Sequence, residues 1–135
     1  MGSSPNRLIG VIFGVVYLLV GVLGFTVTGG VAFAGDQGGL LLGIFQVNPL
    51  HNVAHLLIGA ALLIAGIAGV RAAKTMNTVV GAVYLLLGIV GFFLTGPANF
   101  LALNVADHFL HLASAVVLLG VGLAADTNVR RTAAI

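Results

Sequence analysis

Residues 14–25 read Gly-Val-Val-Tyr-Leu-Leu-Val-Gly-Val-Leu-Gly-Phe, and residues 81–92 read Gly-Ala-Val-Tyr-Leu-Leu-Leu-Gly-Ile-Val-Gly-Phe. Both stretches follow the pattern G-x-x-Y-L-L-x-G-x-x-G-F, and neither contains a charged residue. Each belongs to an apolar run of about 20 residues, which is the length of an α-helix that crosses a bilayer. This repeated motif predicts a chain built from transmembrane helices.

The composition of the whole chain points the same way. Of its 135 residues, 60% are hydrophobic and 6% are charged, whereas a soluble domain carries about 25% charged residues. The chain therefore cannot cover a water-facing surface, and we expect the lipid bilayer to surround it. The absence of cysteine excludes disulfides and thiolate metal sites. The net charge of +2 comes from so few groups that no nucleic-acid partner is expected.

Four apolar runs are long enough to span a membrane, at about residues 8–28, 50–70, 78–94 and 103–125. In such a four-span chain every basic residue falls on one side of the membrane: Arg7, Arg71, Lys74, Arg130 and Arg131. The connections on the other side contain no Lys or Arg. The positive-inside rule then predicts that both termini are cytoplasmic.

The two copies of the motif predict a tandem duplication of a two-helix unit. Repeat 1 covers about residues 7–70 and repeat 2 about residues 76–125, within one integral membrane domain of residues 1–135. Two helices return the chain to its starting side, so the copies insert in the same orientation, related by an axis along the membrane normal. The expected fold is all-α, a four-transmembrane-helix bundle with a pseudo-twofold axis. Because the first run recurs, we expect it to be retained and not cleaved as a signal peptide.

Two similar polar segments open the second and fourth runs. Residues 48–56 read Asn-Pro-Leu-His-Asn-Val-Ala-His-Leu, and residues 104–112 read Asn-Val-Ala-Asp-His-Phe-Leu-His-Leu. In a helix, positions i, i+3, i+4 and i+7 share one face. Each segment thus presents one polar stripe, composed of Asn48, His51, Asn52 and His55 in the first copy and of Asn104, Asp107, His108 and His111 in the second. Polar groups are costly inside a bilayer, so a function is expected at these stripes, near the outer surface.

Histidines three or four residues apart on a helix can reach one metal ion. If the stripes face each other, the expected metal ligands are His51, His55, Asp107, His108 and His111. Asn48, Asn52 and Asn104 would then support these ligands or have a structural role. The donor set suits zinc, nickel, copper(II) or iron better than magnesium or calcium.

Three other interpretations stay open at this point. His55 and His111 are repeat equivalents that could bind a haem between helices, although that side offers no basic residue to the propionates. A proton relay or quinone pocket would use the titration of histidine near neutral pH. The plainest interpretation is structural, with Asn48 and Asn104 capping helices and the other polar groups hydrogen-bonded across the bundle.

The outer connection at residues 29–47 is long and glycine-rich. It contains an apolar segment, residues 40–45, that is too short to span a membrane. We expect this segment to lie at the outer interface or to fold over the bundle mouth as a short helix. The connection would be either a lid over one end of the bundle or a plain connector.

Residues 42–59, with the core V-N-x-x-H-N-x-x-H-L, resemble the signature of a family of small bacterial membrane proteins that is frequent in actinobacteria. The family is classified as domain of unknown function 4383. The resemblance covers nearly the whole chain and implies a four-span protein of the bacterial inner membrane. It implies no activity, cofactor or partner.

No sequence motif for nucleophilic, phosphoryl or nucleotide chemistry occurs, and the chain contains no Glu. We therefore expect a non-enzymatic protein that serves as an accessory or structural subunit, in a larger membrane complex or a homo-oligomer. Its outer polar site would be structural or metal-binding. The alternative is a redox or proton-transfer protein that carries a haem or a transition metal.

Overall fold

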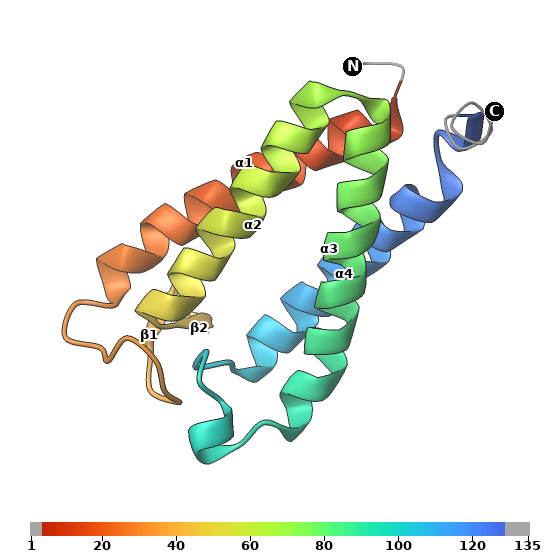
Figure 1. Ribbon diagram of the computed structural model, residues 1–135. Coiled ribbons are helices and arrows are strands. Elements are labelled where there is room, and N and C mark those ends of the chain that lie inside the picture. The colour runs from red at the N-terminus through yellow and green to blue at the C-terminus, as the bar shows by residue number, and fades with distance from the viewer. Residues whose placement is uncertain (1–3, 129–135) are drawn as a thin grey trace.

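The computed structural model describes residues 4–128 and confirms an all-α bundle of four helices (Figure 1). The helices are α1 (Pro5–Gly24), α2 (Pro49–Ala68), α3 (Val70–Val90) and α4 (Val105–Ala124). Short 3₁₀ turns, η1 (Phe25–Val27) and η2 (Gly91–Phe93), extend α1 and α3, and a third, η3 (Gly96–Ala98), lies in the loop before α4. All four helices are long and apolar enough to cross a membrane, so this is a multi-pass membrane protein.

Three of the helices begin at polar caps, as their sequences favour. The side chain of Ser4 accepts a hydrogen bond from the backbone of Arg7 at the start of α1. Asn48 and Asn104 cap α2 and α4 in the same way, and Asn104 forms a reciprocal capping box with Asp107. These contacts satisfy backbone N–H groups that have no partner within the helix.

The bundle consists of two closely packed helix pairs, α1 with α2 and α3 with α4. Gly14 and Gly81 lie against the partner helix so closely that an added Cβ would come within 2.6 Å of the backbone nitrogen of Leu63 or Leu119 respectively. Only glycine permits this approach. The tandem duplication itself stays a prediction. Gly14 and Gly81, which the predicted duplication makes equivalent, nevertheless have the same kind of contact in the two helix pairs.

The two pairs meet in a core drawn from all four helices. Tyr17 of α1 stacks on Tyr84 of α3, with ring centroids 5.2 Å apart. The hydroxyls of Tyr17 and Ser114 of α4 form a buried hydrogen bond of 2.6 Å. Leu62 and Leu118, both fully buried, complete the contact. The outward faces carry exposed apolar side chains instead, including Leu57, Leu86 and Val116, as contact with a bilayer requires.

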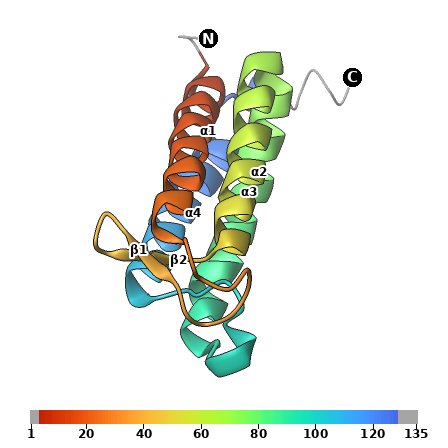
Figure 2. The same cartoon turned by 90° about the vertical axis from the view of Figure 1, so that its left-hand side faces the viewer.

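The outer connection folds differently from our expectation of a short helix, which was wrong. Strands β1 (Gly39–Leu41) and β2 (Phe45–Val47) form an antiparallel hairpin at the end of the bundle opposite to the α2–α3 connection (Figures 1 and 2). The three-residue turn contains Gly43 with a positive φ of 75°, and glycine-containing turns of this length favour hairpins. At Gly39 a side chain would collide with the backbone oxygen of Val27. The hairpin thus packs directly on the end of α1.

The opposite end of the bundle carries the basic residues that the structure describes. Arg7 donates to the backbone oxygens of Gly66 and Ile67 at the end of α2, both at 2.9 Å. Lys74 donates to the carbonyls of Gly122 and Ala125 at the end of α4. Each cation therefore lies at the negative end of a helix dipole. Two basic residues of the positive-inside prediction, Arg130 and Arg131, lie outside the described residues.

Asp126 joins the start of α1 to the end of α4 at this basic end. Its carboxylate accepts hydrogen bonds from the side chains of Ser4 and Asn6 and from the Asn6 backbone. Burial alone would raise the pKa of Asp126, but these hydrogen bonds and the charge of Lys74 outweigh it and hold the pKa below its ordinary value. Asp126 thus favours the folded chain when it is ionised.

Candidate metal centre

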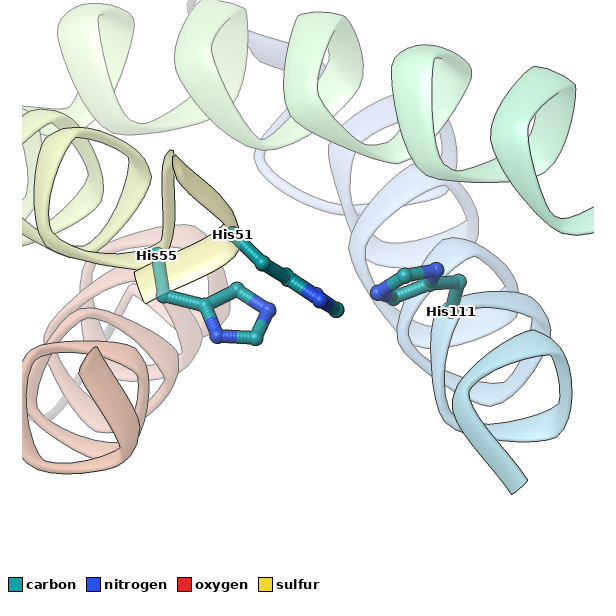
Figure 3. A group of neighbouring side chains, drawn as sticks. All are labelled: His51, His55 and His111. Carbon is teal, nitrogen blue, oxygen red and sulfur yellow. The ribbon is translucent and has the colours of Figure 1, made fainter. Parts of the chain in front are cut away.

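Three of the four histidines meet at the outer end of the core, between the two helix pairs (Figure 3). His51 and His55 lie one turn apart at the start of α2, and His111 comes from α4. All three side chains are at most 3% exposed. Helix α2 begins directly after its cap Asn48, and its first two turns bring both imidazoles against His111 of α4.

The distances within this histidine cluster (His51, His55 and His111) are short. One nitrogen from each ring lies within 4.8 Å of the other two. The ring centroids of His51 and His55 are 4.3 Å apart, and that of His111 lies 5.8 Å from His51 and 6.2 Å from His55. The three centroids therefore form a triangle, with His51 and His55 from α2 opposite His111 from α4 (Figure 3).

Most nitrogens of the cluster are buried without a hydrogen bond. Among the described residues, Nε2 of His51, both ring nitrogens of His55 and Nδ1 of His111 have no hydrogen-bond partner. Leaving a buried polar atom unpaired costs about 1–3 kcal/mol, so native proteins seldom do this without a reason. The cluster therefore holds four buried nitrogens whose hydrogen-bonding capacity is not used by the described residues.

The contact of His51 Nδ1 identifies the tautomer of this ring. Nδ1 lies 3.0 Å from the backbone oxygen of Leu101. A carbonyl only accepts hydrogen bonds, so Nδ1 carries the proton and Nε2 keeps a lone pair. Metal-binding histidines are commonly oriented by such a bond from the other nitrogen to a backbone carbonyl. No sequence pattern marks Leu101, because its contribution is a backbone atom of a loop.

Two tyrosines close the inner side of the cluster. Tyr84 stacks on His111 with centroids 4.9 Å apart and an interplanar angle of 19°. Tyr17 lies tilted against His55 at 5.2 Å. Both tyrosines belong to the repeated motif of residues 14–25 and 81–92. The cluster therefore has an aromatic wall formed by the repeated motif.

Asp107 and His108, the other two expected ligands, lie outside this group. The carboxylate of Asp107 accepts a hydrogen bond from the backbone of Asn104 in the capping box. His108 points into the α3–α4 contact, where its ring packs 4.4 Å from that of Phe92 and fills the space beside Gly91. The physical reason is the rotation of α4, since packing against α3 takes up the face that carries His108. The structure thus brings three of the five expected ligands together.

The three asparagines support the cluster through loops and helix ends. Asn48 caps α2 and also donates to the backbone oxygens of Gly35 and Phe100, at 3.1 and 2.8 Å. Asn52 donates a hydrogen bond to the side chain of Thr28, just after η1, and Asn104 donates to the backbone oxygen of Ile44 in the hairpin turn. Asn48 and Asn104 therefore connect the outer loops to the start of α2 and α4, and Asn48 also orients the segment that carries Leu101.

Comparison with known proteins places the chain in a family. Residues 7–124 match the model of a family described as a domain of unknown function (DUF4383). No curated protein and no solved structure matches the chain. The match covers all four helices, the outer hairpin and the histidine cluster. This four-helix membrane protein therefore belongs to the DUF4383 family.

Proposed function

We propose that this protein is a small, non-enzymatic membrane protein whose histidine cluster binds one divalent transition-metal ion. The observation that carries the proposal is His51, whose Nδ1 bonds to the Leu101 carbonyl while Nε2 is buried without a partner. His55 and His111 lie beside it in the cluster and also have unpaired nitrogens. A cation between the three rings would satisfy all of them at once.

The chemistry of the donors limits the choice of metal. Neutral imidazoles suit zinc, nickel, copper(II) and iron, whereas magnesium and calcium prefer oxygen ligands. Tetrahedral zinc with Zn–N bonds of about 2.0–2.1 Å places two ligand nitrogens roughly 3.3 Å apart. The nitrogens, now within 4.8 Å of one another, would have to draw together by up to about 1.5 Å. Small rotations of the three side chains can supply this change.

The unpaired nitrogens also weigh against a purely structural cluster. Histidines that only hold a bundle together are expected to hydrogen-bond across helices. The described contacts of His55 are ring contacts with Tyr17, His51 and His111, and neither of its nitrogens has a hydrogen-bond partner. Metal ligation accounts for these atoms better than a hydrogen-bonded ladder does.

The same geometry fits a haem less well than a single metal ion. A haem with His55 and His111 as axial ligands needs a flat macrocycle between the two rings. These centroids are 6.2 Å apart, and the His51 ring lies 4.3 and 5.8 Å from them. The His51 ring therefore lies beside the space between His55 and His111 into which the macrocycle would extend. A haem would have to displace this ring together with its bond to Leu101.

We further propose an accessory role in the bacterial inner membrane, within a larger complex or a homo-oligomer. The basic residues at the end of the bundle opposite to the cluster support cytoplasmic termini and an extracytoplasmic metal site. The absence of known catalytic motifs from the sequence supports a non-enzymatic role. Exposed apolar faces on the helices offer partners contact within the bilayer.

Metal analysis of the purified protein tests the proposal. We expect about one zinc, nickel, copper or iron ion per chain by elemental analysis, and a saturable Co²⁺ spectrum after metal removal. Changing His51, His55 or His111 to Ala should weaken Co²⁺ binding at least tenfold. His108→Asn is the matched control, because it removes an imidazole outside the cluster and introduces the residue that repeat 1 carries at the equivalent position, Asn52.

Two outcomes would contradict the proposal. One is a chain that binds no metal after exposure to all four ions while its fold stays intact. The other is His108→Asn weakening Co²⁺ binding as much as His111→Ala does. A Soret band in the purified protein would favour the haem alternative instead.

A further inference from the structure

A cavity of about 370 Å³ lies between α1 and α4, beside the histidine cluster. Val16 and Val20 of α1 form one wall, and Leu110 of α4 forms the other. Leu42 and Phe45 of the hairpin close its outer end. Its size is within the range of about 300–1,000 Å³ that is typical of sites for small molecules.

The cavity opens sideways, toward the bilayer. Ile12 and Val16 belong to its lining and to the membrane-spanning part of α1, and their side chains are 46% and 48% exposed. A molecule dissolved in the membrane can therefore enter without crossing water. The apolar wall would hold a hydrocarbon body by van der Waals contact.

Residues with polar side chains also line the cavity, although the atoms that they present to it are apolar. His55 lines it with a ring that is 3% exposed, and both of its nitrogens have no hydrogen-bond partner. Half a turn of this ring exchanges the positions of its carbons and nitrogens, so a nitrogen can face the cavity without displacing the ring. Asp107 and Ser114, two turns apart on α4, also line the cavity.

The charges around the cavity restrict the polar group that it can accept. Within the described part of the chain, no Lys or Arg lines the cavity to pair with an anionic group. A neutral imidazole offers one donor and one acceptor, and a hydroxyl offers the same pair. A neutral hydroxyl therefore complements His55 better than a carboxylate or phosphate does.

We infer that this cavity binds a membrane-soluble alcohol or phenol, with its hydrocarbon body between α1 and α4 and its hydroxyl on His55. This binding needs no metal ion, so it does not rest on the proposed function. If a metal also binds at the cluster, the molecule approaches it from the bilayer through this cavity.

The test uses the protein in lipid nanodiscs, with ¹⁵N-labelled histidine and a chelator present throughout. The chain has only four histidines, so the ring signals are few and the variant His55→Gln assigns those of His55. The probe is 4-decylphenol, and decylbenzene serves as the probe without a hydroxyl. We expect 4-decylphenol to shift the His55 ring signals saturably. Decylbenzene should bind roughly threefold to tenfold more weakly, as the loss of one hydrogen bond predicts.

Matched variants locate the binding. Val16→Phe fills the cavity and should abolish the saturable shift, whereas Val15→Phe adds the same bulk at a neighbouring exposed position that does not line it. Leu110→Trp blocks the opposite wall and should act as Val16→Phe does. The inference is overturned if 4-decylphenol gives no saturable shift, if decylbenzene binds equally well, or if Val15→Phe and Val16→Phe have the same effect. Because a chelator is present, none of these outcomes depends on metal binding.

Discussion

Tyr17 and Tyr84 stack with their ring centroids 5.2 Å apart and an interplanar angle of 25°, at the centre of the contact between the two helix pairs. They occupy equivalent positions in the two copies of the repeated motif. Each also touches a histidine of the cluster, Tyr17 contacting His55 and Tyr84 contacting His111. One aromatic contact therefore joins the two halves of the bundle and positions the candidate metal centre.

The hydrogen bond between Tyr17 and Ser114 should show energetic coupling. Tyr17→Phe and Ser114→Ala each leave one buried hydroxyl without its 2.6 Å partner, so each should lower the stability of the bundle. The double variant leaves no unpaired hydroxyl, so its loss of stability should be smaller than the sum of the losses in the two single variants. We expect a coupling energy of about 0.6–1.7 kcal/mol in a double-mutant cycle, measured by unfolding in mixed micelles. Strict additivity would show that this contact does not stabilise the fold.

Glycines at the helix contacts should tolerate substitution unequally. At Gly81 an added Cβ would lie 2.6 Å from the backbone nitrogen of Leu119, which cannot move without displacing α4. Gly81→Ala should therefore lower the unfolding free energy by roughly 1–3 kcal/mol, and Gly14→Ala should do the same in the other helix pair. Gly120→Ala is the control, because nothing lies within 4 Å of its added Cβ. Equal stability of Gly81→Ala and Gly120→Ala would contradict this packing.

The two asparagine caps should differ in importance although their sequences match. Serine keeps the cap at either position but cannot reproduce the bonds of the amide nitrogen. Asn48→Ser loses the bonds to Gly35 and Phe100, with the side chain fully buried, and should cost about 1–3 kcal/mol. Asn104→Ser loses one exposed bond to Ile44 and should cost less than about 1 kcal/mol. Equal melting temperatures for the two variants would rule out the proposed anchoring of the loops by Asn48.

Acid should weaken the link between the start of α1 and the end of α4. The folded protein holds the pKa of Asp126 below its ordinary value of 3.8. Its contribution is therefore complete above about pH 4 and is lost as the pH falls through the lower, folded value. Asp126→Asn should reduce the fall in melting temperature below pH 4, because Asn tolerates the positive φ of 54° there but does not titrate.

The exposed Asp36 provides the control for this experiment, since Asp36→Asn should leave the acid-dependent fall in melting temperature intact. If the unmodified protein instead became more stable below pH 4, the result would contradict a lowered pKa for the Asp126 carboxylate.

The outer hairpin shows where sequence interpretation failed. Residues 40–45 are apolar without a clear period, and such short runs do not distinguish a strand from a helix. Gly43 within a three-residue turn was the available signal, because two short apolar runs around such a turn are typical of a hairpin. The collision that any side chain at Gly39 would have with Val27 depends on the distant end of α1, which no local pattern contains.

The candidate metal centre was predicted only in part, again for a physical reason. The spacing of His51 and His55 placed them on one helical face, and the repeat added His111. The same spacing placed Asp107 and His108 in the predicted site, because periodicity defines a face but not the helix that the face contacts. Packing of α4 on α3 directs His108 toward Phe92 instead.

The sequence alone determined the membrane-spanning class of this protein, because a chain with 60% hydrophobic and 6% charged residues can bury four helices only in lipid. It also determined where α2 and α4 begin, because Asn48 and Asn104 cap them through local bonds. Only the tertiary structure decided which histidines meet, that Leu101 orients His51, and that a cavity opens between α1 and α4. These features depend on the rotation and spacing of helices that are far apart in the chain, which long-range packing sets and local sequence does not encode.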